Sequence, residues 1–564
     1  MDRVMVGLLA CLVVGCAGVA PATSPVLASA AAVKAVAISP PGGETSDGWF
    51  RAGSTAAHQR ETGTPRARNI ILFVGDGMSL TTVAAARIFE GQANGQPGEE
   101  HRLSFEEFPQ TAFSRTYNTD SQTPDSAGTM TAMITGAKTR IGMLSVGQAA
   151  PRGNCDASRG QELVSALELA EVAGLSTGVV TNTRFTHATP AASYAHVADR
   201  EWESDGKLND SARAGGCRDI ARQFAEFDIG DGIDVAMGGG RSNFLPDELA
   251  DVEYPDLHGN RRDGRNLVAE WNQRHPEGRY VWNAGQLAAL DLSQTSRLLG
   301  LFEPDHMNYE RDRGNDRGGE PSLSEMTGAA ISVLKRNPKG FLLIVESGRI
   351  DHAHHAGNAW RALSETVSLS DAVRVATKAT SVDDTLILVT ADHSHTLSFV
   401  GYSRRGNPIL GKVAGGSSKD HGGDFAKDAL GLPFTTLTYA NGPGYAGATK
   451  QQPQGSKRFP AEVSKAQPSS GRPDLTQVDT TDPDYLQEST LPLGSETHGG
   501  DDVGIWAQGP GSEAVRGSLE QNVIFHLLVQ AQPRLVKLLC DMGDCEQGVP
   551  VRRPALQSLP RSRR

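Results

Sequence analysis

The stretch Ile70-Ile71-Leu72-Phe73-Val74-Gly75-Asp76 is a short apolar run that ends in a glycine and a carboxylate. A continuous run of this length is typical of a strand buried on both faces of a sheet. Similar runs occur at residues 177–181, 234–237, 341–345, 385–390 and 504–507, with longer helical patterns between them, such as 162–173 and 323–335. Strands that alternate with helices predict an α/β fold with a mostly parallel central sheet sandwiched between helices.

Composition narrows the functional classes. The chain has 564 residues, of which 38% are hydrophobic, and this content argues against a wholly disordered protein. Its formal net charge is −12. We therefore expect no nucleic-acid-binding role, because phosphate contacts require a basic surface.

The N-terminus predicts export. Arg3 is followed by an apolar run over residues 4–14, which is too short to span a bilayer and fits a signal segment. Two processing sites remain open. Ala28-Ser29-Ala30 fits ordinary cleavage, whereas Val13-Val14-Gly15-Cys16 resembles a lipobox, which would place a lipid anchor on Cys16. The expected location is periplasmic, anchored to the cell envelope, or extracellular.

Composition also suggests the domain organisation. Residues 1–30 are interpreted as the signal segment and 31–67 as a flexible leader rich in small residues. Residues 396–497 are dense in Gly, Ser, Pro, Lys and Asp and predict an irregular inserted subdomain. This insertion would divide a catalytic domain of residues 68–395 and 498–545, followed by a disordered Pro/Arg-rich tail at 546–564.

Three of the predicted strands end in a carboxylate, namely Asp76, Glu346 and Asp392, and His393 follows the last of these. The carboxyl ends of parallel strands meet along one edge of a sheet. Carboxylates gathered at that edge would repel one another unless a cation were bound between them. The pattern therefore predicts a metal site.

The segment from Glu346 to His355 supplies further ligands. Asp351 and His355 are spaced i, i+4, so a helical turn places them on one face. A mixed oxygen and nitrogen pair of this kind suits Zn²⁺. His352 and His354 point elsewhere on such a turn, and we expect them to orient ligands or to pack.

Ser126 is the candidate nucleophile. The sequence Thr123-Pro124-Asp125-Ser126-Ala127-Gly128 is typical of a turn that leads into a helix, where free N–H groups favour anions. The G-x-S-x-G sequence of serine hydrolases is absent, so a metal is the expected activator. Arg200 could grip an oxyanion through its planar fork of N–H groups.

These motifs together resemble the alkaline phosphatase family. The resemblance covers roughly residues 68–530 and rests on Gly75-Asp76-Gly77-Met78, Asp125-Ser126-Ala127, Thr186-His187-Ala188-Thr189-Pro190, Val345-Glu346-Ser347-Gly348-Arg349-Ile350-Asp351-His352, Thr390-Ala391-Asp392-His393-Ser394-His395 and Glu496-Thr497-His498. It implies a phosphomonoesterase that forms a phosphoserine intermediate and uses two Zn²⁺ and one Mg²⁺ per chain. The expected substrates are small phosphate monoesters.

The resemblance also implies a role for each site residue. The first Zn²⁺ would be held by Asp351, His355 and His498, the second by Asp76, Asp392 and His393 with Ser126, and Mg²⁺ by Asp76, Thr189 and Glu346. Arg200 would clamp the phosphoryl group. His187 would lie near Mg²⁺ through water, and His395 would orient a ligand.

Further features are carried by resemblance to the animal-type members. These members imply a Ca²⁺ site made by Glu253, the Phe302 carbonyl, Glu303 and Glu320. The resemblance to the family as a whole implies a homodimer. Four cysteines follow the signal segment, and their even number in an exported protein favours two disulfides. The resemblance pairs Cys155 with Cys217 and Cys540 with Cys545.

Two other function classes remain as alternatives. The nearer is a related phosphodiesterase or sulfatase-like hydrolase, although the Cys-x-Pro-x-Arg sequence of a sulfatase nucleophile is absent. The more remote is an inactive exported binding protein, which would show a damaged set of site residues.

Overall fold

A computed structural model describes residues 43–562, except 62, 64–65, 416–424 and 462–464. The predicted signal segment, the Cys16 lipidation site and the leader up to residue 42 lie outside the described residues.

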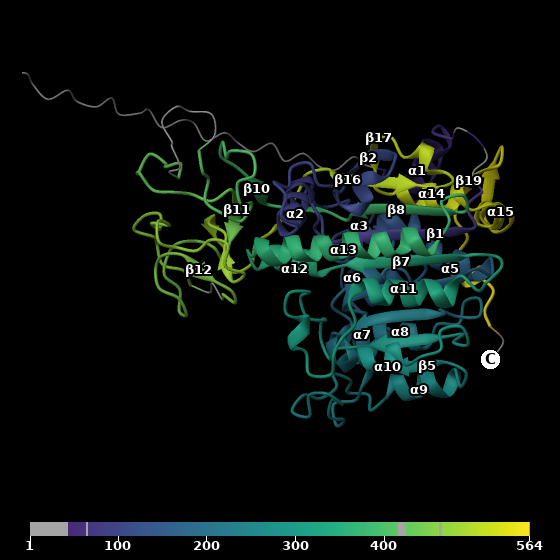
Figure 1. The fold of residues 1–564 in the computed structure, drawn as a ribbon. Coiled ribbons are helices and arrows are strands. Elements are labelled where there is room, and N and C mark those ends of the chain that lie inside the picture. Colours follow the sequence, from purple (N-terminus) through teal and green to yellow (C-terminus); the bar gives the residue numbers. More distant parts are fainter. Residues whose placement is uncertain (1–42, 62, 64–65, 416–424, 462–464, 563–564) are drawn as a thin grey trace, which may run out of the picture. The chain divides into compact units, whose positions relative to one another are not determined.

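A ten-stranded sheet is the framework of the molecule, with strand order β17-β2-β16-β8-β1-β7-β3-β4-β6-β5 (Figure 1). β16 runs antiparallel to β2 and β8, and all other neighbouring strands are parallel. The strands are β1 (Asn69–Gly75), β2 (Gln110–Arg115), β3 (Ser176–Arg184), β4 (Val235–Gly239), β5 (Arg279–Val281), β6 (Leu298–Leu301), β7 (Phe341–Ser347), β8 (Thr385–Ala391), β16 (Val503–Gln508) and β17 (Gly517–Glu520).

Fifteen α-helices accompany these strands in the described residues. They are α1 (Ser46–His58), α2 (Leu80–Ala93), α3 (Ser126–Thr135), α4 (Cys155–Ser158), α5 (Ala166–Val172), α6 (Ala188–Ala191), α7 (Asp210–Ala214), α8 (Ile220–Ala225), α9 (Leu267–Arg274), α10 (Ala284–Ala288), α11 (Leu323–Leu334), α12 (Arg349–His355), α13 (Ala359–Ala379), α14 (Val523–Ala531) and α15 (Pro533–Met542).

Both faces of the sheet are buried, as the continuous apolar runs require. In β1, Ile70, Leu72 and Val74 belong to one hydrophobic cluster, with α1, α3, α5, α14 and α15. Ile71 and Phe73 belong to a second cluster, with α2, α11 and α13. Alternate side chains of one strand thus serve opposite layers. The predicted α/β sandwich is confirmed.

The helix boundaries follow capping chemistry. The Ser165 side chain caps α5, and Glu168 returns a bond to the Ser165 backbone. This capping box makes the helix begin at Ala166, four residues after the predicted start at 162. A second capping box, between Ser322 and Glu325, starts α11 at the predicted position.

The flexible leader extends too far in the sequence prediction. Thr45 caps α1, and Phe50 of this helix is fully buried against Phe525 and His526. A composition rich in small residues suggested a linker. One large aromatic anchor on a helix of small residues is sufficient to bury a face, because small side chains allow close packing.

The predicted disorder of the tail at 546–564 is wrong for the residues that the structure describes there. β18 (Asp544–Glu546) and β19 (Val549–Arg552) form an antiparallel pair, and β19 packs against α1. The disulfide between Cys540 and Cys545 closes the turn from α15 into β18. These two links give the short polar tail a fixed place.

The described residues of the segment 396–497 lie mostly in loops and short strands. Two small sheets lie apart from the large sheet in Figure 1: β10 (Leu397–Phe399), β11 (Leu437–Gly442) and β14 (Ser489–Pro492), and the pair β12 (Lys457–Arg458) and β13 (Tyr485–Leu486). A further pair, β9 (Ser394–His395) and β15 (His498–Gly499), joins the two ends of this segment.

Both predicted disulfides are present, Cys155–Cys217 and Cys540–Cys545. Disulfides of this kind persist in oxidising compartments, which agrees with export. Within the described ranges, no single helix is long and apolar enough to cross a membrane.

Candidate active site

Three carboxylates meet at the carboxyl edge of the central strands. Asp76 follows β1, Glu346 lies near the end of β7, and Asp392 follows β8. The register pairs Val74 with Glu346 and Gly75 with Ala391, so the three side chains are neighbours. All three are fully buried. Burial and the charges of Asp392, Asp351 and Glu346 raise the pKa of Asp76 well above its usual range.

Three imidazoles at this edge make the same kind of hydrogen bond. The Nδ1 atoms of His355, His393 and His498 each contact a backbone carbonyl, those of Glu496, Ser394 and Pro124, at 2.5, 3.3 and 2.7 Å. A carbonyl can only accept, so Nδ1 carries the proton. Each Nε2 therefore presents a lone pair to the carboxylates, which is the tautomer that metal ligation requires.

The donor atoms are too close for a cluster without a cation. The Nε2 atoms of His355 and His498 are 3.1 Å apart, and each lies within 3.4 Å of an Asp351 carboxylate oxygen. With their protons on Nδ1, these two nitrogens have no hydrogen to share. A bound cation resolves the contact, and a mixed set of nitrogen and carboxylate donors fits Zn²⁺.

A second donor set lies beside the first. His393 Nε2 is 3.4 Å from Asp76 Oδ1 and 3.3 Å from Asp392 Oδ2. The other Asp392 oxygen accepts from the backbone N–H groups of Gly77 and His393, at 2.9 and 2.8 Å. The His393 and His498 rings stack at 3.6 Å, which brings the two donor sets side by side.

His395 has both ring nitrogens engaged. Nε2 lies 2.7 Å from Asp351 Oδ1, and Nδ1 pairs with the Glu496 carboxylate. Burial alone would lower the pKa of His395, but Glu496 and Asp351 together raise it to about 10. Glu496 was not among the predicted site residues, although it stands two positions before His498. Its position two residues before a candidate ligand histidine was the signal that the sequence offered.

A third group consists of oxygens. Asp76 Oδ2, Thr189 Oγ1 and Glu346 Oε1 are buried without a hydrogen-bond partner among the described residues. Asp76, Glu346 and His187 lie close enough to share one ion. Burial raises the pKa of Glu346 to about 7. Unpaired oxygen donors of this kind fit a hard cation such as Mg²⁺.

His187 lies between this oxygen group and Arg200. Its Nε2 is 2.9 Å from Arg200 Nη2 and therefore accepts, because a guanidinium can only donate. Burial, followed by the charge of Arg200, lowers the pKa of His187 well below its usual range. In this neutral ring the proton sits on Nδ1, so that nitrogen can donate to water but not bind a metal directly.

Ser126 stands at the first position of α3, where Asp125 caps the helix through Gly128 N–H at 3.1 Å. Ser126 Oγ is 3.3 Å from His393 Nε2 and 3.4 Å from Asp76 Oδ1. The second Asp125 oxygen holds Arg200 Nη1 at 3.1 Å. The predicted nucleophile and clamp therefore lie beside the predicted metal ligands.

The helical turn at 349–355 behaves as the spacing predicts. α12 places Asp351 and His355 on one face, with Oδ1 and Nε2 3.4 Å apart. His354 points the other way and contacts Thr82 Oγ1 and Tyr439 Oη, at 2.9 and 2.7 Å. His352 contacts Arg349 Nη1 at 2.9 Å.

The predicted calcium ligands are only partly brought together. Glu253 and Glu303 lie within reach of one ion, and the third member of this group is Asp316, which was not predicted. Glu320 instead accepts from the Asn308 backbone N–H through both oxygens, at 2.9 and 3.2 Å. Phe302 is buried immediately before Glu303. Asp316 lies in the loop of residues 311–319, whose composition gave no ligand signal.

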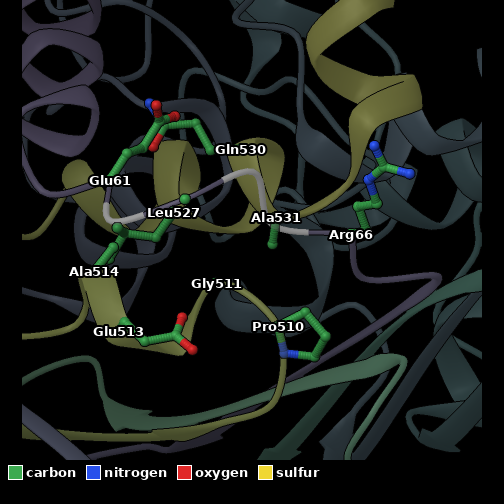
Figure 2. Close-up of a pocket in the computed structure, with 10 residues that line it drawn as sticks. Glu61, Arg66, Pro510, Gly511, Glu513, Ala514, Leu527, Gln530 and Ala531 are labelled. Atoms are coloured by element: carbon green, nitrogen blue, oxygen red, sulfur yellow. The ribbon is translucent and has the colours of Figure 1, made fainter.

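A separate cavity of about 260 Å³ lies between α14 and the loop after β16 (Figure 2). Glu61, Arg66, Glu513, Leu527 and Gln530 are among its lining residues. None of the predicted site residues lines this cavity, so the candidate active site is the group of side chains at the sheet edge.

A serine at a helix N-terminus, a neighbouring arginine and adjoining donor sets for two kinds of cation are typical of a metal-dependent hydrolase of the phosphoryl-transfer class. The sequence model of the family described as alkaline phosphatase matches residues 67–533. The chain belongs to this family. It is a phosphomonoesterase whose cofactors are two Zn²⁺ and one Mg²⁺.

Characterised relatives cover most of the chain. The alkaline phosphatase of Gadus morhua is 46% identical over 471 residues, which are 83% of this chain and 92% of that protein. The tissue-nonspecific isozyme of Homo sapiens is 43% identical over 482 residues, covering 84% and 86%. The solved structure of Thermus thermophilus alkaline phosphatase shares the fold, with a TM-score of 0.57 at 24% identity, over 86% of this chain and 98% of that one.

Proposed function

We propose that this protein hydrolyses small phosphate monoesters through a phosphoserine intermediate on Ser126. The observation that carries the proposal is the position of Ser126 Oγ, 3.3 Å from His393 Nε2 and 3.4 Å from Asp76 Oδ1. A hydroxyl at a helix N-terminus beside a cation-binding donor set is placed for nucleophilic attack.

The donor sets divide among three ions. Asp351, His355 and His498 would hold one Zn²⁺; Asp76, Asp392 and His393, with Ser126, the second; and Asp76, Thr189 and Glu346 the Mg²⁺. When bound, these ions lower the pKa of the Ser126 hydroxyl and neutralise charge on the leaving oxygen. His187 would lie near the Mg²⁺ through water, and His395 would hold Asp351 in place.

The protein's own residues carry the two displacements. Ser126 Oγ attacks phosphorus as the bond from phosphorus to the alcohol oxygen breaks, and the released alkoxide takes up a proton. Water then attacks the phosphoserine, the Oγ–P bond breaks, and Ser126 regains its proton as phosphate leaves. Arg200 keeps one N–H on each terminal nitrogen free of Asp125 and His187, and these two can bind phosphoryl oxygens throughout.

The test compares two esters and two enzymes. With p-nitrophenyl phosphate, we expect Ser126→Ala to lower activity by about 10³-fold or more while the zinc sites stay largely intact, because Asp76, Asp392 and His393 remain. Bis-p-nitrophenyl phosphate should be a poor substrate of the wild type. A phosphoryl group trapped on another residue, or a preference for the diester, would contradict the proposal.

We also propose a Ca²⁺ site remote from the catalytic edge. Glu253, Glu303, the Phe302 carbonyl and Glu320 were predicted for it, and Asp316 joins Glu253 and Glu303 in the structure. Burial, Asp316 and the charges of Glu253 and Glu320 raise the pKa of Glu303 to about 10. An all-oxygen set whose members repel one another suits a hard cation.

We further propose that the exported chain is a homodimer, with Cys16 as the candidate for a lipid anchor at the cell envelope. Metabolic labelling with a fatty acid tests the anchor: label on the wild type but not on Cys16→Ser supports it, and unlabelled wild type excludes it. Sedimentation equilibrium tests the dimer, which a monomer mass would exclude.

A further inference from the structure

Lys138 is a fully buried lysine three residues after the end of α3. Its side chain is 1% exposed. The ammonium group donates to the carbonyls of Tyr117 and Arg115, at 3.0 and 3.3 Å, and pairs with Glu520 Oε2 at 2.9 Å. It also lies 3.3 Å from the centre of the Tyr117 ring.

An ammonium group away from water is costly unless all of its protons are paired. Here the pairing comes from the segment that leaves β2 at Arg115 and from Glu520 at the end of β17. Glu520 also accepts from Arg115 Nη1 at 3.0 Å. Lys138 therefore holds the backbone of residues 115–117 by contacts that a neutral side chain of the same length cannot make.

The fixed segment leads directly to the catalytic serine. Asn118 follows Tyr117, and its Nδ2 donates to Asp125 Oδ1 at 3.0 Å. The Asn118 side chain has little room to move, because a Cβ added at Gly128 would lie 2.7 Å from it. Asp125 thus accepts from Asn118 Nδ2 and the Gly128 N–H on one oxygen. Its other oxygen accepts from Arg200 and from the Gly142 N–H.

We propose that Lys138 is a positioning residue for the phosphoryl clamp. It holds residues 115–117 so that Asn118 orients the Asp125 carboxylate, and Asp125 in turn aims Arg200 at the phosphoryl oxygens. The inference rests on the proposed role of Arg200 as the clamp. Lys138 thus acts in transition-state positioning although it touches neither the substrate nor a metal ligand.

The chain offers a matched control. Lys457 is also 1% exposed, and its ammonium donates to the carbonyls of Pro453 and Gly455, at 2.8 and 2.9 Å. It lies in the inserted segment, outside the clamp network. Lys457→Met removes a buried lysine that has carbonyl partners but no carboxylate partner, so it reports the cost of losing a buried ammonium outside the clamp network.

The experiment measures inhibition by inorganic phosphate, kcat/KM for p-nitrophenyl phosphate and Tm. Lys138→Met should weaken phosphate inhibition about tenfold and lower kcat/KM roughly 10- to 100-fold, as expected for a displaced clamp. Lys457→Met should lower Tm and leave both other quantities unchanged. Asn118→Ala, which keeps Lys138 in place, should weaken phosphate inhibition as Lys138→Met does, and it provides the test if Lys138→Met does not fold.

The Arg200→Ala variant distinguishes a failure of the Lys138 positioning role from a failure of the proposed clamp role of Arg200. If Arg200→Ala alone leaves phosphate inhibition unchanged, the clamp itself is wrong. If Arg200→Ala weakens inhibition and Lys138→Met or Asn118→Ala adds no further loss in that background, the positioning role holds. Wild-type phosphate inhibition in Lys138→Met and Asn118→Ala, or a fully additive loss, would overturn it.

Discussion

Two acidic clusters in this molecule differ in the elements that build them. At the catalytic edge, Asp76 and Asp392 directly follow parallel strands of the large sheet, and imidazoles complete the donor sets. In the remote cluster, Glu303 lies just beyond β6, whereas Glu253 and Asp316 lie in loops, and all ligands are oxygens. In both clusters the carboxylates repel one another when no cation is bound. The donor atoms decide which cation relieves the repulsion: zinc at the catalytic edge and, as we propose, calcium at the remote cluster.

Removal of the metals should give the largest contrast between the clusters. Exhaustive chelation with EDTA should abolish hydrolysis of p-nitrophenyl phosphate by several orders of magnitude, because the catalytic donor sets then lack their ions. Zn²⁺ with Mg²⁺ should restore activity, and Ca²⁺ alone should not. Recovery with Ca²⁺ alone would show that the two clusters are not distinguished by their donors.

Glu496→Gln should produce an intermediate effect confined to the catalytic edge. The variant removes the charge that holds His395 against Asp351, so zinc should bind about 10- to 100-fold more weakly. Competition with a chromophoric chelator measures this change.

A suitable control for that variant is Glu171→Gln. Glu171 is also buried, and burial raises its pKa well above the usual range, but it contacts Thr177 and Gly232 away from the metal ligands. Its zinc affinity should equal that of the wild type. Equal zinc affinity in Glu496→Gln and wild type would remove the role assigned to Glu496.

The remote cluster should show the smallest effect, and only in stability. Ca²⁺ should raise Tm by binding the folded state, and Glu303→Gln should abolish that rise while sparing activity. Without a cation, the pKa of Glu303 is raised from 4.5 to about 10. Between these values the folded chain holds a proton that the unfolded chain releases, so stability falls as pH rises.

Thermal melts of chelated protein between pH 5 and 10 check this sign. The decline in Tm across that range should be shallower in Glu303→Gln than in the wild type. Equal slopes, together with an equal response of both proteins to Ca²⁺, would exclude the remote site.

The catalytic edge could be predicted in large part because its ligands obey local rules. The ends of the predicted strands identify Asp76, Glu346 and Asp392 as candidate metal ligands. The i, i+4 spacing identifies Asp351 and His355 as a further pair. His498 was different, because no local pattern links it to residues more than a hundred positions earlier. Only resemblance to the family supplied it.

The remaining misses share one physical cause, which is that tertiary contacts override composition. Asp316 stands in a loop with no periodicity, so nothing local marks it as a neighbour of Glu253. The small residues of α1 suggested a linker, but Phe50 anchors the helix to α14. The polar tail suggested disorder, but β19 pairs with β18 and packs on α1.

The two-residue pairing of β9 with β15 has a consequence for how this enzyme can vary. It sets His498 opposite His395 and Gly499 opposite Ser394, so the hundred residues between them leave and return at one closed stem. The entropy cost of closing a loop grows only slowly with its length. The segment 396–497 can therefore change its length or surface in related sequences without moving the metal ligands. This holds provided that the β9–β15 pair, Glu496 and the contact of Tyr439 with His354 are kept. The β9–β15 pair is therefore an insertion point, where the surface of the inserted segment can change while the catalytic residues keep their positions.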